Sequence, residues 1–95
     1  MVKHIVFFKL SDNSEANKQA LKDRIMSMQG KLNFMKHLEV GINFSTEERA
    51  FDVVLINDFE TKEDLQMYAT HPIHLEVVNF IKSLGVISKV VDYEY

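Results

Sequence analysis

The 95-residue sequence contains no cysteine and no tryptophan, a single proline and three glycines. Without cysteine the chain can form neither a disulfide nor a thiolate metal site, and a reducing compartment such as the cytoplasm is expected. Its apolar runs fall far short of the ~20 residues that a membrane-spanning helix needs. We therefore expect no membrane partner, and the short alternating segment at the start does not resemble a secretory leader.

An excess of charge of one sign is also missing. The sequence has 11 basic and 14 acidic residues, a net charge of −3, and the basic residues do not gather into a stripe. Such a surface would repel a phosphate backbone, so nucleic acid is not an expected partner. No glycine-rich phosphate loop and no serine or cysteine nucleophile motif is present. No cofactor is expected.

The chain does contain a regular alternation of strand and helix patterns. Residues 2–10 alternate as a strand, with His4, Val6, Phe8 and Leu10 on one face and Ile5 and Phe7 on the other. Helical spacing then predicts a helix over about residues 15–29, with Ser14 as its N-cap and Gly30 as its end. Residues 38–44 form a second strand with Leu38, Val40, Ile42 and Phe44 on one face, and residues 50–58 form a third that is apolar on both faces.

Two short helices are predicted on either side of the single proline. Residues 61–64, Thr-Lys-Glu-Asp, resemble a capping box and open the first of them. His71 precedes proline, which disfavours helical backbone angles. Pro72 suits the first position of a new helix, which Gly85 ends. Residues 86–95 complete the chain as a last strand.

This order of elements is the ferredoxin-like βαββαβ unit of the α+β class, and residues 1–95 are expected to form a single domain. Right-handed crossovers place the first and third strands in the middle of a four-stranded antiparallel sheet, with the helices on one face. Both of these strands are apolar on both faces, as central strands should be.

The helices can cover only one face of such a sheet. We assign Val6, Phe8, Val40 and Ile42 to the other, open face. Leaving large apolar side chains in water costs about 1.5–3 kcal/mol each, and the resulting patch exceeds what soluble monomers usually expose. We therefore expect a homodimer in which the open sheet faces of two copies meet and close a barrel.

The segment from Tyr68 to His74, Tyr-Ala-Thr-His-Pro-Ile-His, gathers a phenol and two imidazoles. His74 lies in the first turn of a helix, where the positive helix end and burial both disfavour the imidazolium. A neutral imidazole could act as a base near pH 7, and the Tyr68 hydroxyl could hold a carbonyl or enolate oxygen. With His4 and a wall of Val6 and Phe8, these groups would suit proton abstraction next to a carbonyl.

Each polar residue also has a purely structural interpretation. His71 suits a backbone hydrogen bond that fixes the turn before Pro72. His4 suits a hydrogen-bonded histidine inside the barrel. The three histidines could be imagined as a metal site, but His71 points from a turn and no carboxylate is clearly placed to help. No metal is expected.

Six segments resemble the stress-responsive A/B barrel (Dabb) family in the same order along the chain. They are His4 to Lys9, Gly41 to Ser45, Phe51-Asp52, Phe59-Glu60, Tyr68 to His74 and Val91 to Tyr93. The Tyr-x-x-His-Pro-x-His element is the most specific, and the resemblance implies a dimeric α+β barrel.

In plant polyketide cyclases of this family, the motif's tyrosine and last histidine act in an aldol cyclisation. The resemblance places these roles on Tyr68 and His74, and the strand-one histidine matches His4. The chain departs from those cyclases on the third strand, which has no histidine. It also has Val77 where the family frequently has phenylalanine.

Three functional hypotheses follow. The first is a homodimeric barrel that binds a small apolar or carbonyl-containing molecule, or serves a stress-related role without turnover. The candidate contacts of the bound molecule are Tyr68, His74, His4, Val6, Phe8 and His71. The second is a cyclase-like or isomerase-like enzyme with His74 as general base and Tyr68 as oxyanion partner. The third is a structural dimer whose barrel is filled by its own side chains. A cavity of at least ~300 Å³ at Tyr68 and His74 would favour a ligand or substrate.

Overall fold

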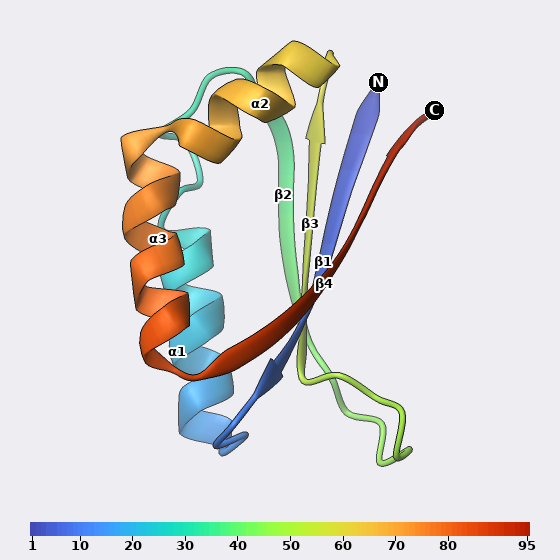
Figure 1. The fold of residues 1–95 in the computed structure, drawn as a ribbon, viewed down its shortest axis with the longest axis vertical. Helices are drawn as coiled ribbons and strands as arrows, with labels where there is room; N and C mark the ends of the chain where they lie inside the picture. Colours follow the sequence, from blue (N-terminus) through green and yellow to red (C-terminus); the bar gives the residue numbers. More distant parts are fainter.

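The computed structural model describes residues 1–95 as a four-stranded sheet with a layer of helices on one face (Figure 1). The elements in chain order are β1 (Val2–Leu10), α1 (Glu15–Met26), β2 (Met35–Ile42), β3 (Val53–Phe59), α2 (Lys62–Thr70), α3 (Pro72–Ser83) and β4 (Val86–Glu94). The strand order is β2-β3-β1-β4, and all neighbours are antiparallel. The ferredoxin-like prediction, with the first and third strands in the middle, is confirmed. No helix is both long enough and apolar enough to cross a bilayer.

The hydrophobic core lies between the helices and the even-numbered side chains of β1. Val6 and Phe8 are buried there against Leu21 and Ile25 of α1, in a cluster that continues through β2 and β3. Neighbouring strands place their alternate residues on the same face, so Val40 of β2 joins this core.

The assignment of Val6, Phe8, Val40 and Ile42 to the open face is therefore wrong. The first three belong to the core, and Ile42 pairs with buried Val53 on the same side of the sheet. Alternation shows which residues of a strand share a face. It does not show which of two apolar faces the helices cover.

The opposite side of the sheet is nevertheless uncovered and apolar, as expected. We call it the open face; its apolar members are Ile5, Phe7, Val54, Ile56, Ile87, Val91 and Tyr93. Phe7 remains 41% exposed and Val91 52% exposed. Since soluble monomers rarely leave such a surface in water, this face needs a partner.

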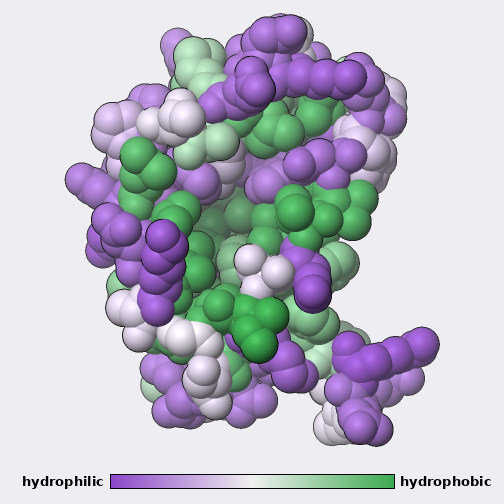
Figure 2. All heavy atoms as spheres, in the orientation of Figure 1, coloured by the Kyte–Doolittle hydropathy of each residue, from purple (hydrophilic) through white to green (hydrophobic).

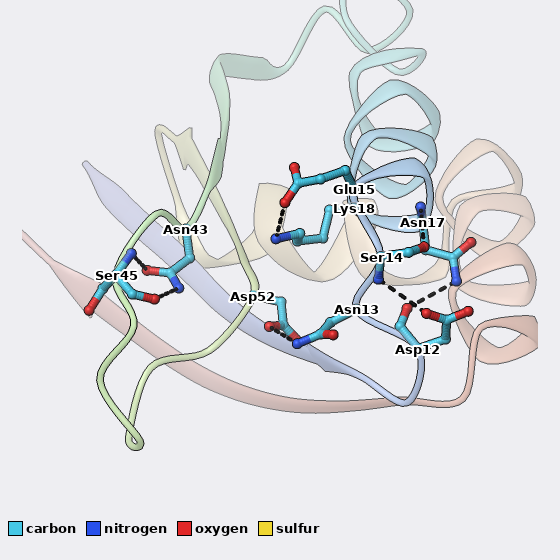
Figure 3. A network of polar contacts seen from close by, with 9 residues as sticks. All are labelled: Asp12, Asn13, Ser14, Glu15, Asn17, Lys18, Asn43, Ser45 and Asp52. Atoms are coloured by element: carbon cyan, nitrogen blue, oxygen red, sulfur yellow. Dashed lines mark hydrogen bonds and ion pairs between the residues drawn. The ribbon is translucent and has the colours of Figure 1, made fainter.

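Local side-chain bonds define where α1 begins. The Ser14 hydroxyl accepts a hydrogen bond from the Asn17 backbone N–H at 3.2 Å, and Asp12 accepts from the Ser14 N–H at 3.1 Å (Figure 3). The predicted N-cap is confirmed. The helix ends at Met26 rather than near residue 29, because the chain passes through a series of turns before Gly30, whose φ is +80°.

The β2–β3 loop, residues 43–52, leaves the sheet and projects away from it (Figure 1). Asn43 bonds to both the N–H and the carbonyl of Ser45, at 3.0 and 2.8 Å, and turns the chain outward (Figure 3). Phe44 is consequently 98% exposed, so its predicted place on a half-buried strand face is wrong. Buried Asp52 returns the loop to the fold by accepting a 2.8 Å bond from the Leu10 N–H.

Candidate ligand-binding site

A cavity of about 330 Å³ lies between the helix layer and the sheet. Figure 2 shows apolar side chains gathered in a hollow between the two layers, within a more polar rim. Its lining residues come from β1, α1 and the turn that follows it, β3, α2, α3 and β4, and include no acidic side chain. A hollow of about 450 Å³ beside the β2–β3 loop is larger but is lined by none of the candidate polar residues.

This location corrects the sequence-based interpretation in one respect. We expected the cavity to form where the sheets of two copies meet. The cavity instead lies inside one chain, because His4, Val6 and Phe8 of β1 face the helix layer, from which Tyr68 and His74 line the same cavity. A second copy is not required to form its walls.

The junction of α2 and α3 places the motif's side chains. His71 has an extended backbone, with ψ at 137°, as a residue before proline should. Its Nδ1 accepts a 3.1 Å hydrogen bond from the Ile73 N–H, so it caps α3. The expected structural role of His71 is confirmed. The residue does not line the cavity, and its ring lies 6.2 Å from that of Phe34.

His74 lines the cavity from the first turn of α3. Its Nδ1 donates a 3.0 Å hydrogen bond to the Ala69 carbonyl at the end of α2, which leaves Nε2 as an acceptor. Burial lowers the pKa of His74, opposed in part by this bond and assisted by the neighbouring His4 and His71. The imidazole is therefore neutral near pH 7, as a general base must be.

Tyr68 is 1% exposed, and its ring centroid lies 4.2 Å from that of His74. Its hydroxyl is buried without a hydrogen-bond partner. Burial raises the pKa of Tyr68 to about 12, against a smaller lowering effect of the Asn57 side chain. Asn57 is near enough to affect this pKa, but no bond of hydrogen-bonding geometry joins it to the hydroxyl: its Nδ2 donates to Met35 Sδ, and both the hydroxyl and Asn57 Oδ1 are without a partner. Tyr68 thus remains a protonated donor at neutral pH.

His4 contributes the third polar group from β1. Its ring packs edge-on against that of Tyr68 with centroids 6.0 Å apart. Its Nδ1 pairs with Oδ1 of Asp92, directly opposite on β4. A carboxylate only accepts, so this bond places a proton on Nδ1.

The structure thus brings Tyr68, His74 and His4 together, with Val6 and Phe8 in the same cavity wall. Of the predicted contacts, only His71 lies outside the lining. No three histidine, aspartate or glutamate side chains come together in a way that could hold a metal ion.

Two groups of residues at the site were not identified from the sequence. Asp92 was missed, although pairing the last strand antiparallel to the first would have placed it opposite His4. The α3 residues Val78 and Lys82 were also missed, although they continue the spacing of three and four residues that starts at His74. Val77 also lines the cavity.

The fold and site together define a ferredoxin-like α+β domain with a mostly apolar cavity, which a tyrosine and two histidines line beside a few other polar side chains. Within that class, residues 2–95 match the stress-responsive A/B barrel domain. The chain belongs to this family.

One curated relative is a stress-response A/B barrel domain-containing protein of Arabidopsis thaliana, which is 36% identical over 85 residues. The match covers 82% of this chain and 30% of the relative, so the chain spans less than a third of that protein's length.

Solved structures also share the fold. A protein of unknown function from Bacteroides fragilis, described as dimeric and ferredoxin-like, is 30% identical, with a TM-score of 0.83 over 99% of this chain and 95% of that one. A Dabb family protein from Mesorhizobium loti is 16% identical, with a TM-score of 0.80 over 99% and 95% of the two chains. The second likeness concerns the fold alone.

Proposed function

We propose that this single domain is a homodimeric binding protein for a small, mostly apolar carbonyl compound, which it holds in the cavity beside Tyr68 and His74. The supporting observation is the Tyr68 hydroxyl, a buried donor without a partner at the edge of an apolar cavity. Unpaired buried polar groups are costly, and a ligand carbonyl would satisfy this one. A cytoplasmic location, expected from the composition, is part of the proposal.

The size of the cavity supports binding over the alternative of a barrel filled by its own side chains. At about 330 Å³ it exceeds the limit set from the sequence and lies at the small end of ligand pockets. Ten of its 14 lining residues are hydrophobic, so an apolar ligand would gain by leaving water for this cavity.

Binding of decan-2-one, followed by NMR shifts of the cavity residues, tests this proposal. We expect shifts at His4, Tyr68 and His74, and about tenfold weaker binding to Tyr68→Phe, which keeps the ring but loses the donor. Tyr93→Phe is the matched control, because its hydroxyl lies outside the cavity. Absence of ketone binding, or equal binding by Tyr68→Phe, would refute the proposal.

A second candidate, proton abstraction next to a carbonyl, is favoured by the state of His74. Its lowered pKa keeps Nε2 unprotonated at neutral pH, and its ring lies against that of the proposed oxyanion donor, Tyr68. In this hypothesis Nε2 of His74 takes a proton from the carbon beside the carbonyl, and the resulting enolate oxygen accepts a hydrogen bond from Tyr68.

Deuterium exchange separates this enzyme hypothesis from binding alone. In D₂O, an active site of this kind should accelerate exchange of the hydrogens beside the carbonyl of decan-2-one. His74→Ala should abolish the acceleration while preserving the dimer, and His37→Ala, which changes an exposed histidine, should not. If the wild-type protein binds the ketone without accelerating exchange, or if exchange survives His74→Ala, His74 is not the base.

The homodimer in this proposal forms through the open face. A relative that is 30% identical is described as dimeric, and this chain exposes Phe7, Ile87 and Val91 on one continuous side of its sheet. A two-fold contact would bury the open faces of both copies at once.

A further inference from the structure

The cavity has polar groups at both of its ends. One end holds Tyr68, His74 and His4. At the other end Lys82 follows His74 by eight residues along α3, a rise of about 12 Å. On the sheet side, Ser88 lies opposite Phe8, four residues or about 13 Å along β1 from His4. The walls between the two ends are apolar.

Lys82 is the only lysine or arginine among the lining residues, and no aspartate or glutamate accompanies it. It forms none of the chain's ion pairs. Ser88, in the same lining, is an exposed residue whose hydroxyl makes no hydrogen bond within the chain. A cation and a free hydroxyl donor at the mouth of an apolar cavity are complementary to an anionic group.

We propose that the ligand is a linear oxo-carboxylic acid, whose carboxylate binds Lys82 and Ser88 at one end of the cavity and whose carbonyl accepts a hydrogen bond from Tyr68 at the other. This inference rests on the proposed function and adds the second anchor. The apolar middle of the ligand would lie along Phe8, Val77 and Ile81. A neutral ketone of the same length would use only the inner end.

Four probes separate the two anchors: 9-oxodecanoic acid, its methyl ester, decan-2-one and decanoic acid, with affinities measured by calorimetry. We expect the oxo acid to bind about tenfold tighter than its ester, because a hydrogen bond to a charged group exceeds a neutral one. Because Lys82 is exposed, this advantage should shrink as ionic strength rises from about 0.05 to 0.5 M.

Lys82→Met should remove the advantage of the oxo acid and leave the ester and decan-2-one unchanged. Lys31→Met is the matched control, since it deletes an exposed lysine that does not line this cavity. Lys82 lies in the last turn of α3, where a positive charge also stabilises the helix by interacting with its dipole. The stability of Lys82→Met is therefore measured alongside its affinity. If Lys82→Met lowers stability but not acid affinity, the lysine serves only the helix.

The outcomes also distinguish this inference from the proposed function. Equal affinity for acid and ester, or acid binding that does not depend on Lys82, overturns the oxo-acid assignment while ketone binding still stands. Failure of decan-2-one and of both oxo compounds to bind overturns the two proposals together.

Discussion

The rings of Tyr68 and His74 lie in contact, with centroids 4.2 Å apart and planes tilted by 40°, although the helices that carry them are separated at Pro72. In one continuous helix, residues six apart point about 120° away from each other around the axis. The break before Pro72 redirects the chain, and the bond from His74 Nδ1 to the Ala69 carbonyl links the two helices across the break. The break at Pro72 therefore brings Tyr68 and His74 together at the cavity, although Pro72 itself does not line it.

The unpaired Tyr68 hydroxyl leads to a stability prediction. Because burying an unsatisfied hydroxyl is unfavourable, Tyr68→Phe should raise the free energy of unfolding by about 1 kcal/mol. Denaturant unfolding without added ligand measures this. Tyr93→Phe, which changes an exposed tyrosine whose hydroxyl makes no hydrogen bond within the chain, should alter stability by less than about 0.5 kcal/mol. A clear loss of stability in Tyr68→Phe would mean that the hydroxyl has a bonding partner in the free protein.

The lowered pKa of His74 predicts a dependence of stability on pH. In the unfolded chain a histidine has a pKa of about 6.5, whereas burial lowers the pKa of folded His74 below that value. As pH falls through 6.5 the unfolded state takes up the proton first, so stability should decrease with falling pH. His74→Asn keeps a donor for Ala69 and should show a shallower decrease in unfolding titrations between about pH 7.5 and 5.5. His37→Asn, at an exposed position, should follow the wild type; identical slopes in all three proteins would refute the assignment.

The bond between His4 and Asp92 predicts a fixed tautomer. Asp92 accepts from Nδ1, so neutral His4 should carry its proton there and present Nε2 to the cavity. Asp92→Asn replaces the carboxylate by an amide and should increase the population of the Nε2–H form. Long-range ¹H–¹⁵N correlation spectra of the histidine ring report this directly. If the Nε2–H tautomer already dominates in the wild type, Asp92 does not orient His4.

Much of the fold could be predicted from local patterns in the sequence. The alternation from Val2 to Leu10 defines β1 because one residue in two meets the core, and Ser14 and Pro72 mark helix starts because their side chains impose them. The Tyr68 and His74 pair was also identifiable, since both belong to one short motif. These features depend on neighbours within a few residues.

The remaining features depend on choices between distant segments. Because β1 is apolar on both faces, its pattern does not determine whether Val6 or Ile5 packs against the helices. The sequence-based prediction therefore placed the cavity on the wrong side of the sheet. Asp92 joined the site only through the pairing of β4 with β1. Phe44 continued a strand pattern, but the side chain of Asn43 redirects the backbone just before it.

Buried Asp52 predicts a loss of stability on truncation. Its carboxylate accepts bonds from the Leu10 N–H at 2.8 Å and from the Asn13 side chain at 3.4 Å. Asp52→Ala leaves a buried N–H unpaired, which should lower the free energy of unfolding by about 1–3 kcal/mol. Phe44→Ser, on the same loop but exposed, should be nearly neutral. Equal effects of the two changes in denaturant unfolding would contradict this account of the loop.

The last prediction concerns the relation between dimer and cavity. Phe7→Glu places a charge in the middle of the open face, so light scattering should report a change from twice 11.1 kDa to 11.1 kDa. Leu75→Glu, exposed on α3 and outside the cavity lining, should stay dimeric. A wild-type protein of 11.1 kDa would refute the dimer itself.

Because the cavity walls come from one chain, monomeric Phe7→Glu should still bind decan-2-one with affinity close to that of the wild type. Circular dichroism and the NMR shifts of His74 would verify that the monomer keeps its fold. Loss of ketone binding in a folded monomer would mean that the second copy completes the site, and that a single chain carries only part of it.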